Sequence, residues 1–175
     1  MAFISSGGTV IAFAEYSDVT LADQRLFEAN EGLADENLVE DLTIKATSRI
    51  LQLIRNTDWW RRYYLIESNS SQRAAIQTLG RIDPPLPNPN LIIGRQADFT
   101  DLCVYFTFSE YLLPKIADFG NADSAEVKKV GFYDRRFRTL FDELIEAGNW
   151  YDWDASGVIT NLEKLPNRVN LVRAR

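Results

Sequence analysis

Residues 35–54, DENLVEDLTIKATSRILQLI, decide the fold of this chain, because their apolar side chains repeat with the period of an α-helix. Asp35 stands before the first of them and is the predicted N-terminal cap. The stretch therefore predicts a long amphipathic helix that packs on the core of a helical domain. At about 100° per residue, one face collects Leu38, Val39, Leu42, Ala46, Ile50, Leu53 and Ile54.

Two further apolar residues of this segment, Ile44 and Leu51, lie on the opposite side of the predicted helix. A helix with a second apolar stripe usually contacts two partners. In one interpretation both partners belong to the same domain, and in the other the second stripe contacts a neighbouring subunit. The sequence leaves both open, and under the second interpretation Ile44 and Leu51 are interface residues.

Residues 58–66, DWWRRYYLI, continue the helical pattern with an aromatic cluster. On a helix, Trp59 lies next to Tyr63, and Trp60 lies next to Tyr64. Interleaved aromatic and basic residues also occur where proteins stack single-stranded nucleic acid. We favour a core or interface role, because no wider field of basic residues surrounds the cluster. Trp59 and Trp60 accordingly join the predicted subunit interface.

Other segments extend the helical pattern on both sides of this pair. Residues 97–113 are apolar on nearly all sides, and we favour a buried helix over a strand because of their length and the stop at Pro114. Cys103, inside this segment, is predicted to be a small core residue. The further predicted helices span residues 21–30, 72–79 and 125–147.

These elements predict an all-α fold: a compact bundle of four to five helices with extended N- and C-terminal arms. Residues 1–17 form the predicted N-terminal arm, and residues 18–150 form the predicted bundle. Residues 151–175 form a predicted acidic turn followed by an extended tail.

The bulk composition excludes several function classes. A single cysteine excludes an internal disulfide, and the absence of histidine excludes the Ser-His-Asp triad and the usual zinc sites. The net charge of −6 disfavours general binding to nucleic acid. No phosphate-binding glycine loop or nucleophile motif is present, so we expect no enzyme. The start, MAFISSGGTV, has no basic residue of the kind that begins a signal peptide, and we expect a protein made in the cytoplasm without membrane association.

An acidic loop at residues 151–164, YDWDASGVITNLEK, contains the ligand order of a calcium-binding EF-hand loop. Gly148 interrupts the preceding helix and Pro166 follows the loop closely, so a switching sensor is not expected. Two interpretations remain: a structural Ca²⁺ site, or an acidic turn held by its own hydrogen bonds. The candidate ligands are Asp152, Asp154, Ser156, Val158 through its carbonyl, Thr160 and Glu163.

The C-terminal tail, RVNLVRAR at residues 168–175, combines apolar and basic residues. One interpretation adds this tail to the surface of a partner as an extended segment. The other treats it as a frayed end or an edge strand within the chain. Under the first interpretation the docking residues are Val169, Leu171, Val172, Arg173 and Arg175.

Taken together, these segments resemble the head–tail connector (adaptor or neck) proteins of tailed bacteriophages. The resemblance covers most of the chain from about Asp18 onward. It lies in DENLVEDL at residues 35–42 with the long helix and aromatic cluster that follow, and in the apolar helix of residues 102–113. It continues in YDRRF at residues 133–137 and in the YDWDASG turn with the C-terminal end.

The resemblance implies a structural virion protein that assembles as a ring, commonly of twelve copies. Such a ring sits at the head–tail junction and joins the portal protein to a downstream neck or tail protein. DNA passes through its lumen without specific binding. No cofactor is required, although Ca²⁺ is a candidate ligand. The alternative function, based on the residues alone, is a stand-alone calcium-binding module that uses the Asp152–Glu163 loop.

Overall fold

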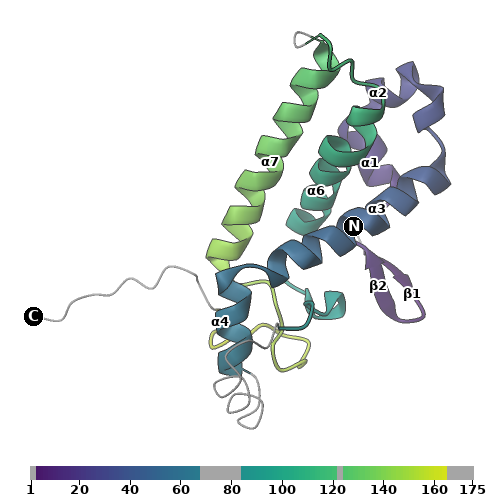
Figure 1. Ribbon diagram of the computed structural model, residues 1–175. Helices are drawn as coiled ribbons and strands as arrows, with labels where there is room; N and C mark the ends of the chain where they lie inside the picture. Colours follow the sequence, from purple (N-terminus) through teal and green to yellow (C-terminus); the bar gives the residue numbers. More distant parts are fainter. Residues whose placement is uncertain (1–2, 68–83, 122–123, 165–175) are drawn as a thin grey trace, which may run out of the picture. The chain divides into compact units, whose positions relative to one another are not determined.

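The computed structural model describes residues 3–67, 84–121 and 124–164 of the 175-residue chain (Figure 1). These residues are mostly helical, which confirms the predicted all-α class. None of the described helices is both long and apolar enough to cross a membrane. The strands and α-helices are β1 (Ile4–Ser6), β2 (Thr9–Ala12), α1 (Tyr16–Ala22), α2 (Gln24–Ala29), α3 (Glu36–Arg55), α4 (Asp58–Glu67), α6 (Gln96–Thr107) and α7 (Ala125–Ala147).

The chain divides into two compact units, and the division falls within α3 and α7. The first unit contains residues 1–50 and 95–142, and the second contains residues 51–94 and 143–175. The predicted bundle over residues 18–150 divides the chain differently. Sequence periodicity locates each helix but carries no information about which end of a long helix packs with which neighbours.

The long helix α3 forms as its sequence predicts. Asp35 caps it, because the Asp35 carboxylate accepts the N–H of Asn37 at 3.1 Å and the Asp35 carbonyl accepts the N–H of Val39 at 3.1 Å. In the first unit its predicted apolar face is buried, with Val39, Ala46 and Ile50 each fully inaccessible. Burial of this stripe orients α3 on the core of the first unit.

The N-terminal residues form a hairpin rather than a plain extension. β1 and β2 pair antiparallel, and Gly7 and Gly8 between them adopt positive φ angles of 59° and 82°. Phe13, just after β2, is fully buried. Its N–H donates to the Thr47 hydroxyl at 3.0 Å, and its carbonyl accepts the Thr100 hydroxyl at 2.8 Å. The end of the predicted arm is therefore part of the core of the first unit.

The apolar segment predicted at residues 97–113 is helical, as the sequence favours. α6 continues into a π-helical turn, η3 (Phe108–Leu112), and a 3₁₀ turn, η4 (Leu113–Lys115), which contains Pro114. Cys103 is fully buried in α6, and burial raises the pKa of its thiol to about 11. The thiol is therefore a core group and not a nucleophile.

Helix α7 has the bounds that the sequence predicts. The Ser124 hydroxyl accepts the N–H of Val127 at 3.2 Å, and Gly148 with φ of 54° follows the last turn. Figure 1 shows α7 beside α6. In the first unit Phe106 of α6 lies 5.0 Å from Phe137 of α7 between ring centroids, and Phe108 of η3 stacks on Tyr133 of α7 at 4.6 Å. The short helix predicted over residues 72–79 lies outside the described residues.

Candidate metal loop and surface cleft

An aromatic cluster forms the core of the second unit around the acidic loop. Trp59 lies 4.9 Å from Trp150 between ring centroids, and Trp60 stacks on Trp153 at 5.1 Å. Trp59 and Trp60 are each only 1% exposed. A ring buried to this extent cannot stack on a base, which excludes single-strand binding by these two side chains. The core interpretation of the cluster is the one that its burial supports.

The four residues expected at a subunit interface are mostly covered within the chain. Leu51 is 7% exposed, and only Ile44 is half-buried. These four side chains therefore expose little surface to which another copy could bind. A charged substitution at Leu51 is expected to unfold the chain rather than to leave a folded monomer.

Backbone contacts hold the start of the acidic loop against the segment before α6. Ile92 and Tyr151 form an isolated antiparallel bridge, and the Asp152 N–H donates to the Leu91 carbonyl at 2.9 Å. Gly94 donates its N–H to the Trp150 carbonyl at 3.1 Å. A Cβ at Gly94 would lie 2.7 Å from the Asn149 carbonyl oxygen, so only glycine permits this approach. The position of Asp152 is thus fixed by the core of the second unit.

The loop brings its three carboxylates together, as the ligand order predicts. Single oxygen atoms of Asp152, Asp154 and Glu163 all lie within 4.8 Å of one another. Asp152 and Glu163 are buried, at 1% and 7% exposure, whereas Asp154 is exposed. Convergent carboxylate oxygens are the ligands that Ca²⁺ prefers.

Hydrogen bonds from the loop backbone satisfy the same carboxylates. Glu163 Oε1 accepts the N–H of Trp153 at 2.7 Å, and Oε2 accepts the N–H of Thr160 at 2.8 Å and its hydroxyl at 2.9 Å. The Asp152 carboxylate accepts the N–H of Gly157 at 2.7 Å. Gly157 has φ of 83°, which allows the tight turn that this contact needs. These bonds are those of the acidic-turn interpretation. With the Asp154 N–H, which donates to Oε1 at 3.2 Å, they occupy all four acceptor sites of Glu163, whereas Asp152 and Asp154 keep lone pairs for a cation.

The hydrogen bonds also set the ionisation of the loop. Burial opposes ionisation of Glu163, but the hydrogen bonds from Thr160, Asp154 and Trp153 outweigh it and hold the pKa of this carboxyl below its usual value. Hydrogen bonds from Ser156 lower the pKa of the Asp154 carboxyl. The carboxyl groups of Glu163 and Asp154 are therefore ionised at neutral pH, and uncharged N–H and O–H groups donate hydrogen bonds to them.

The remaining candidate ligands lie around this cluster without completing it. The Ser156 hydroxyl donates to the Val158 carbonyl at 3.1 Å, which couples two of the predicted ligands to each other. The Thr160 hydroxyl contacts Glu163. Helix α7 ends at Ala147, before the loop begins, so the entering helix of an EF-hand is absent from the described residues. The predicted docking tail, from Val169 to Arg175, lies outside the described residues.

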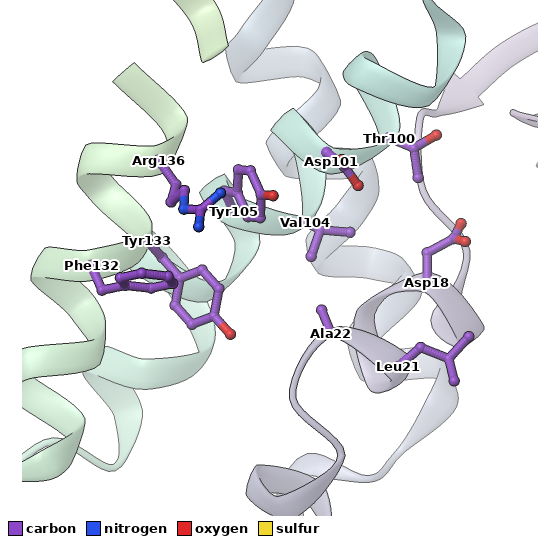
Figure 2. A pocket seen from close by; sticks show the side chains of 10 residues that line it. All are labelled: Asp18, Leu21, Ala22, Thr100, Asp101, Val104, Tyr105, Phe132, Tyr133 and Arg136. Carbon is purple, nitrogen blue, oxygen red and sulfur yellow. The ribbon is translucent and has the colours of Figure 1, made fainter. Parts of the chain in front are cut away.

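A second feature, a surface cleft of about 410 Å³ in the first unit, has no counterpart in the sequence analysis. Figure 2 shows it between α1, α6 and α7. Two apolar side chains at the cleft are exposed, Leu21 by 77% and Phe132 by 45%. Tyr133 also lines it, and burial raises the pKa of the Tyr133 hydroxyl to about 12. The sequence predicts Leu21 at the start of a helix over residues 21–30, whereas in the structure it lies near the end of α1.

In comparisons with known proteins, the chain matches no protein-family model, no curated protein and no solved structure.

Proposed function

We propose that this chain is a structural virion protein that forms a ring between the portal and the tail of a tailed bacteriophage. The ring, commonly of twelve copies, joins the head to a downstream neck or tail protein and extends the DNA channel. Two things support the proposal: the resemblance of residues 35–50, 133–137 and 151–157 to connector proteins, and a helical fold of the kind that the resemblance implies. The net charge of −6 suits a lumen through which DNA slides without binding.

The observation that carries the proposal is a set of exposed charges of opposite sign on two helices of the first unit. Helix α7 exposes Arg135 and Arg138, of which Arg138 also pairs with Asp134 at 3.0 Å. The N-terminal part of α3 exposes Glu36 and Asp41. Two different faces that complement each other join copies head to tail, and such contacts close into a ring when the rotation between copies permits it. Complementary charge also steers the encounter and fixes its orientation.

The apolar centre that such an interface needs is present on the same helix. Phe132 lies on α7, one turn before Arg135, and is 45% exposed. The guanidinium of Arg136 lies 5.2 Å from the centroid of the Phe132 ring. An exposed aromatic residue among arginines is typical of protein–protein contacts, in which both residue types are enriched.

Charge reversal on α7 is expected to abolish ring assembly. The double variant Arg135→Glu/Arg138→Glu should sediment as a 20.0 kDa monomer, whereas the native chain sediments as a ring at the same concentration. Adding Glu36→Lys and Asp41→Lys to the same chain should restore the ring, because the two faces are again complementary. Sedimentation velocity at low and high salt measures all three proteins.

The matched control is Arg61→Glu/Arg62→Glu, which makes the same charge change at exposed positions of α4 and should leave the ring intact. A ring that survives charge reversal on α7 would contradict the assigned interface. A native chain that stays monomeric when concentrated, and also with a portal protein added, would contradict the proposed function itself.

A calcium-binding module is the second candidate function, favoured by the three carboxylates within 4.8 Å of one another. If the loop binds Ca²⁺, the melting temperature should rise on addition of Ca²⁺ and return to its original value on addition of a chelator. Ligand at a hundredfold excess over Kd stabilises the folded state by about 2.7 kcal/mol. Glu163→Gln should remove the shift, because the residue at the last position of the loop supplies two ligand oxygens.

Glu143→Gln serves as the control for this experiment, because Glu143 is an exposed acid of α7 outside the loop. Its Ca²⁺-dependent shift should equal that of the native chain. Calorimetry that records no heat on Ca²⁺ addition to the native chain, together with an unchanged melting temperature, would leave only the acidic-turn interpretation.

A further inference from the structure

The cleft between α1, α6 and α7 is lined by two carboxylates, Asp18 and Asp101, by the single guanidinium of Arg136 and by aromatic rings, so its net charge is negative. The Asp101 carboxylate makes no ion pair with any described residue, and the Asp18 carboxylate accepts the N–H of Glu15 at 3.0 Å. Figure 2 shows both carboxylates on the side of the cleft formed by α1 and α6, across from Phe132 and Tyr133 of α7. One side of the cleft is therefore acidic, and the other carries the aromatic rings together with the guanidinium of Arg136.

The electrostatics of the cleft favour a cationic occupant. Burial raises the pKa of the Asp101 carboxyl, and the carboxylates of Asp98 and Asp18 raise it further. The Asp98 carboxylate already pairs with Arg95 at 2.5 Å, which leaves Asp18 and Asp101 for an added cation. A guanidinium that entered the cleft would relieve the repulsion between these carboxylates.

The walls suit aliphatic side chains that accompany such a cation. The Phe132 and Tyr133 rings face the cleft, and Leu21 lies exposed on the α1 side. Aromatic faces bind both apolar side chains and guanidinium groups. The occupant with the best match is therefore a segment in which arginines alternate with aliphatic residues.

Residues 168–175 of this chain, RVNLVRAR, have that composition, with three arginines and three large aliphatic residues on an otherwise acidic protein. The eleven residues that follow Lys164 reach up to about 36 Å when extended, at about 3.3 Å per residue. A tail of this length is sufficient to leave its own chain and enter a neighbouring one.

We propose that the C-terminal tail of one copy docks in the α1–α6–α7 cleft of a second copy. Its aliphatic residues contact Leu21 and the Tyr133 ring, and its arginines pair with Asp18 and Asp101. The inference rests on the proposed function, because it needs copies placed side by side. A tail and a cleft on every copy are two different surfaces, which is the heterologous arrangement that a closed ring requires.

Thiol cross-linking in the full-length chain tests this proposal. The variant Leu21→Cys/Ala174→Cys places one thiol at the cleft and one in the tail, and a short bismaleimide should link them between chains. We expect a ladder of dimers and higher multimers on a denaturing gel. The native Cys103 thiol is fully buried with a pKa raised to about 11, so it should not react.

Two comparisons make the result specific. Leu162→Cys/Ala174→Cys moves the first thiol to another exposed leucine, which is 89% exposed in the second unit, and should give at least fivefold less cross-linked product. Asp101→Arg in the original cysteine pair should lower the yield to a similar extent, because it reverses the charge of the cleft. Asp142→Arg, at an exposed position of α7, should leave the yield unchanged.

The outcomes separate this inference from the proposed function. A ring by sedimentation with no cross-linking above the Leu162 control overturns the tail docking and leaves the ring standing. A product that migrates only as an internally linked monomer places the tail in its own cleft and overturns docking between copies. A chain that neither assembles nor cross-links overturns both.

Discussion

Replacing Trp150 by alanine is expected to lower the free energy of unfolding of the second unit by about 3–5 kcal/mol, the usual cost of truncating a buried tryptophan. Trp150 is fully buried, and its ring centroid lies 4.9 Å from that of Trp59 and 5.8 Å from that of Tyr151. Its indole N–H donates to the Leu144 carbonyl at 2.8 Å. The substitution therefore opens a cavity and removes one of two hydrogen bonds to the Leu144 carbonyl, which keeps the Gly148 N–H at 3.1 Å.

Denaturant titration followed by tryptophan fluorescence measures this effect, because all four tryptophans lie in the second unit. Trp150→Phe keeps most of the apolar volume and loses only the hydrogen bond, so its destabilisation should be smaller. Leu162→Ala, at a residue that is 89% exposed, should change the free energy of unfolding by no more than about 0.5 kcal/mol. If Trp150→Ala costs no more than Leu162→Ala, the aromatic cluster is not the core of this unit.

Replacing Phe108 by alanine is expected to destabilise the first unit by a similar amount, about 3–5 kcal/mol. Phe108 is fully buried at the start of the π-helical turn that follows α6. Its ring stacks on Tyr133 at 4.6 Å with 15° between planes, and it meets Phe27 edge-on at 6.3 Å. Aromatic pairs of this kind add about 0.5–1.5 kcal/mol beyond the burial of their area.

Amide hydrogen exchange in α6 and α7 is the suitable measurement, because fluorescence does not report on the first unit. Protection in both helices should fall in Phe108→Ala, since the lost ring packs directly after α6 against Tyr133 of α7. Phe119→Ala is the matched control, because Phe119 is 62% exposed and its truncation should leave the exchange rates unchanged. Equal protection in the two variants would show that the stacked pair contributes little to this core.

The helices were predictable because their signals are local. The apolar period of residues 35–54, the Asp35 cap and the glycine at position 148 each act within one or two turns of the chain, and each appears in the structure. The first helix was predicted over residues 21–30, but the structure has two shorter helices, α1 and α2, that meet at Asp23. No residue in that segment breaks the pattern, so packing decides the break.

The candidate loop was predictable for the same reason. The spacing of Asp152, Asp154 and Glu163 fixes which oxygens converge within a short segment, and the structure brings these oxygens together. The sequence also left two interpretations of the loop open. The described hydrogen bonds belong to the acidic turn.

Long-range packing decided the rest. The sequence by itself determined the bounds of α3 and α7 and which residues gather in the acidic loop, because capping, periodicity and turn formation depend on neighbours along the chain. Only the tertiary structure decided that Trp59 and Trp60 are buried, that Phe13 enters a core, and that α1, α6 and α7 form a cleft. Each of these facts depends on contacts between residues far apart in sequence. An amphipathic pattern predicts that one face of a helix is buried, but it does not predict which other residues bury it.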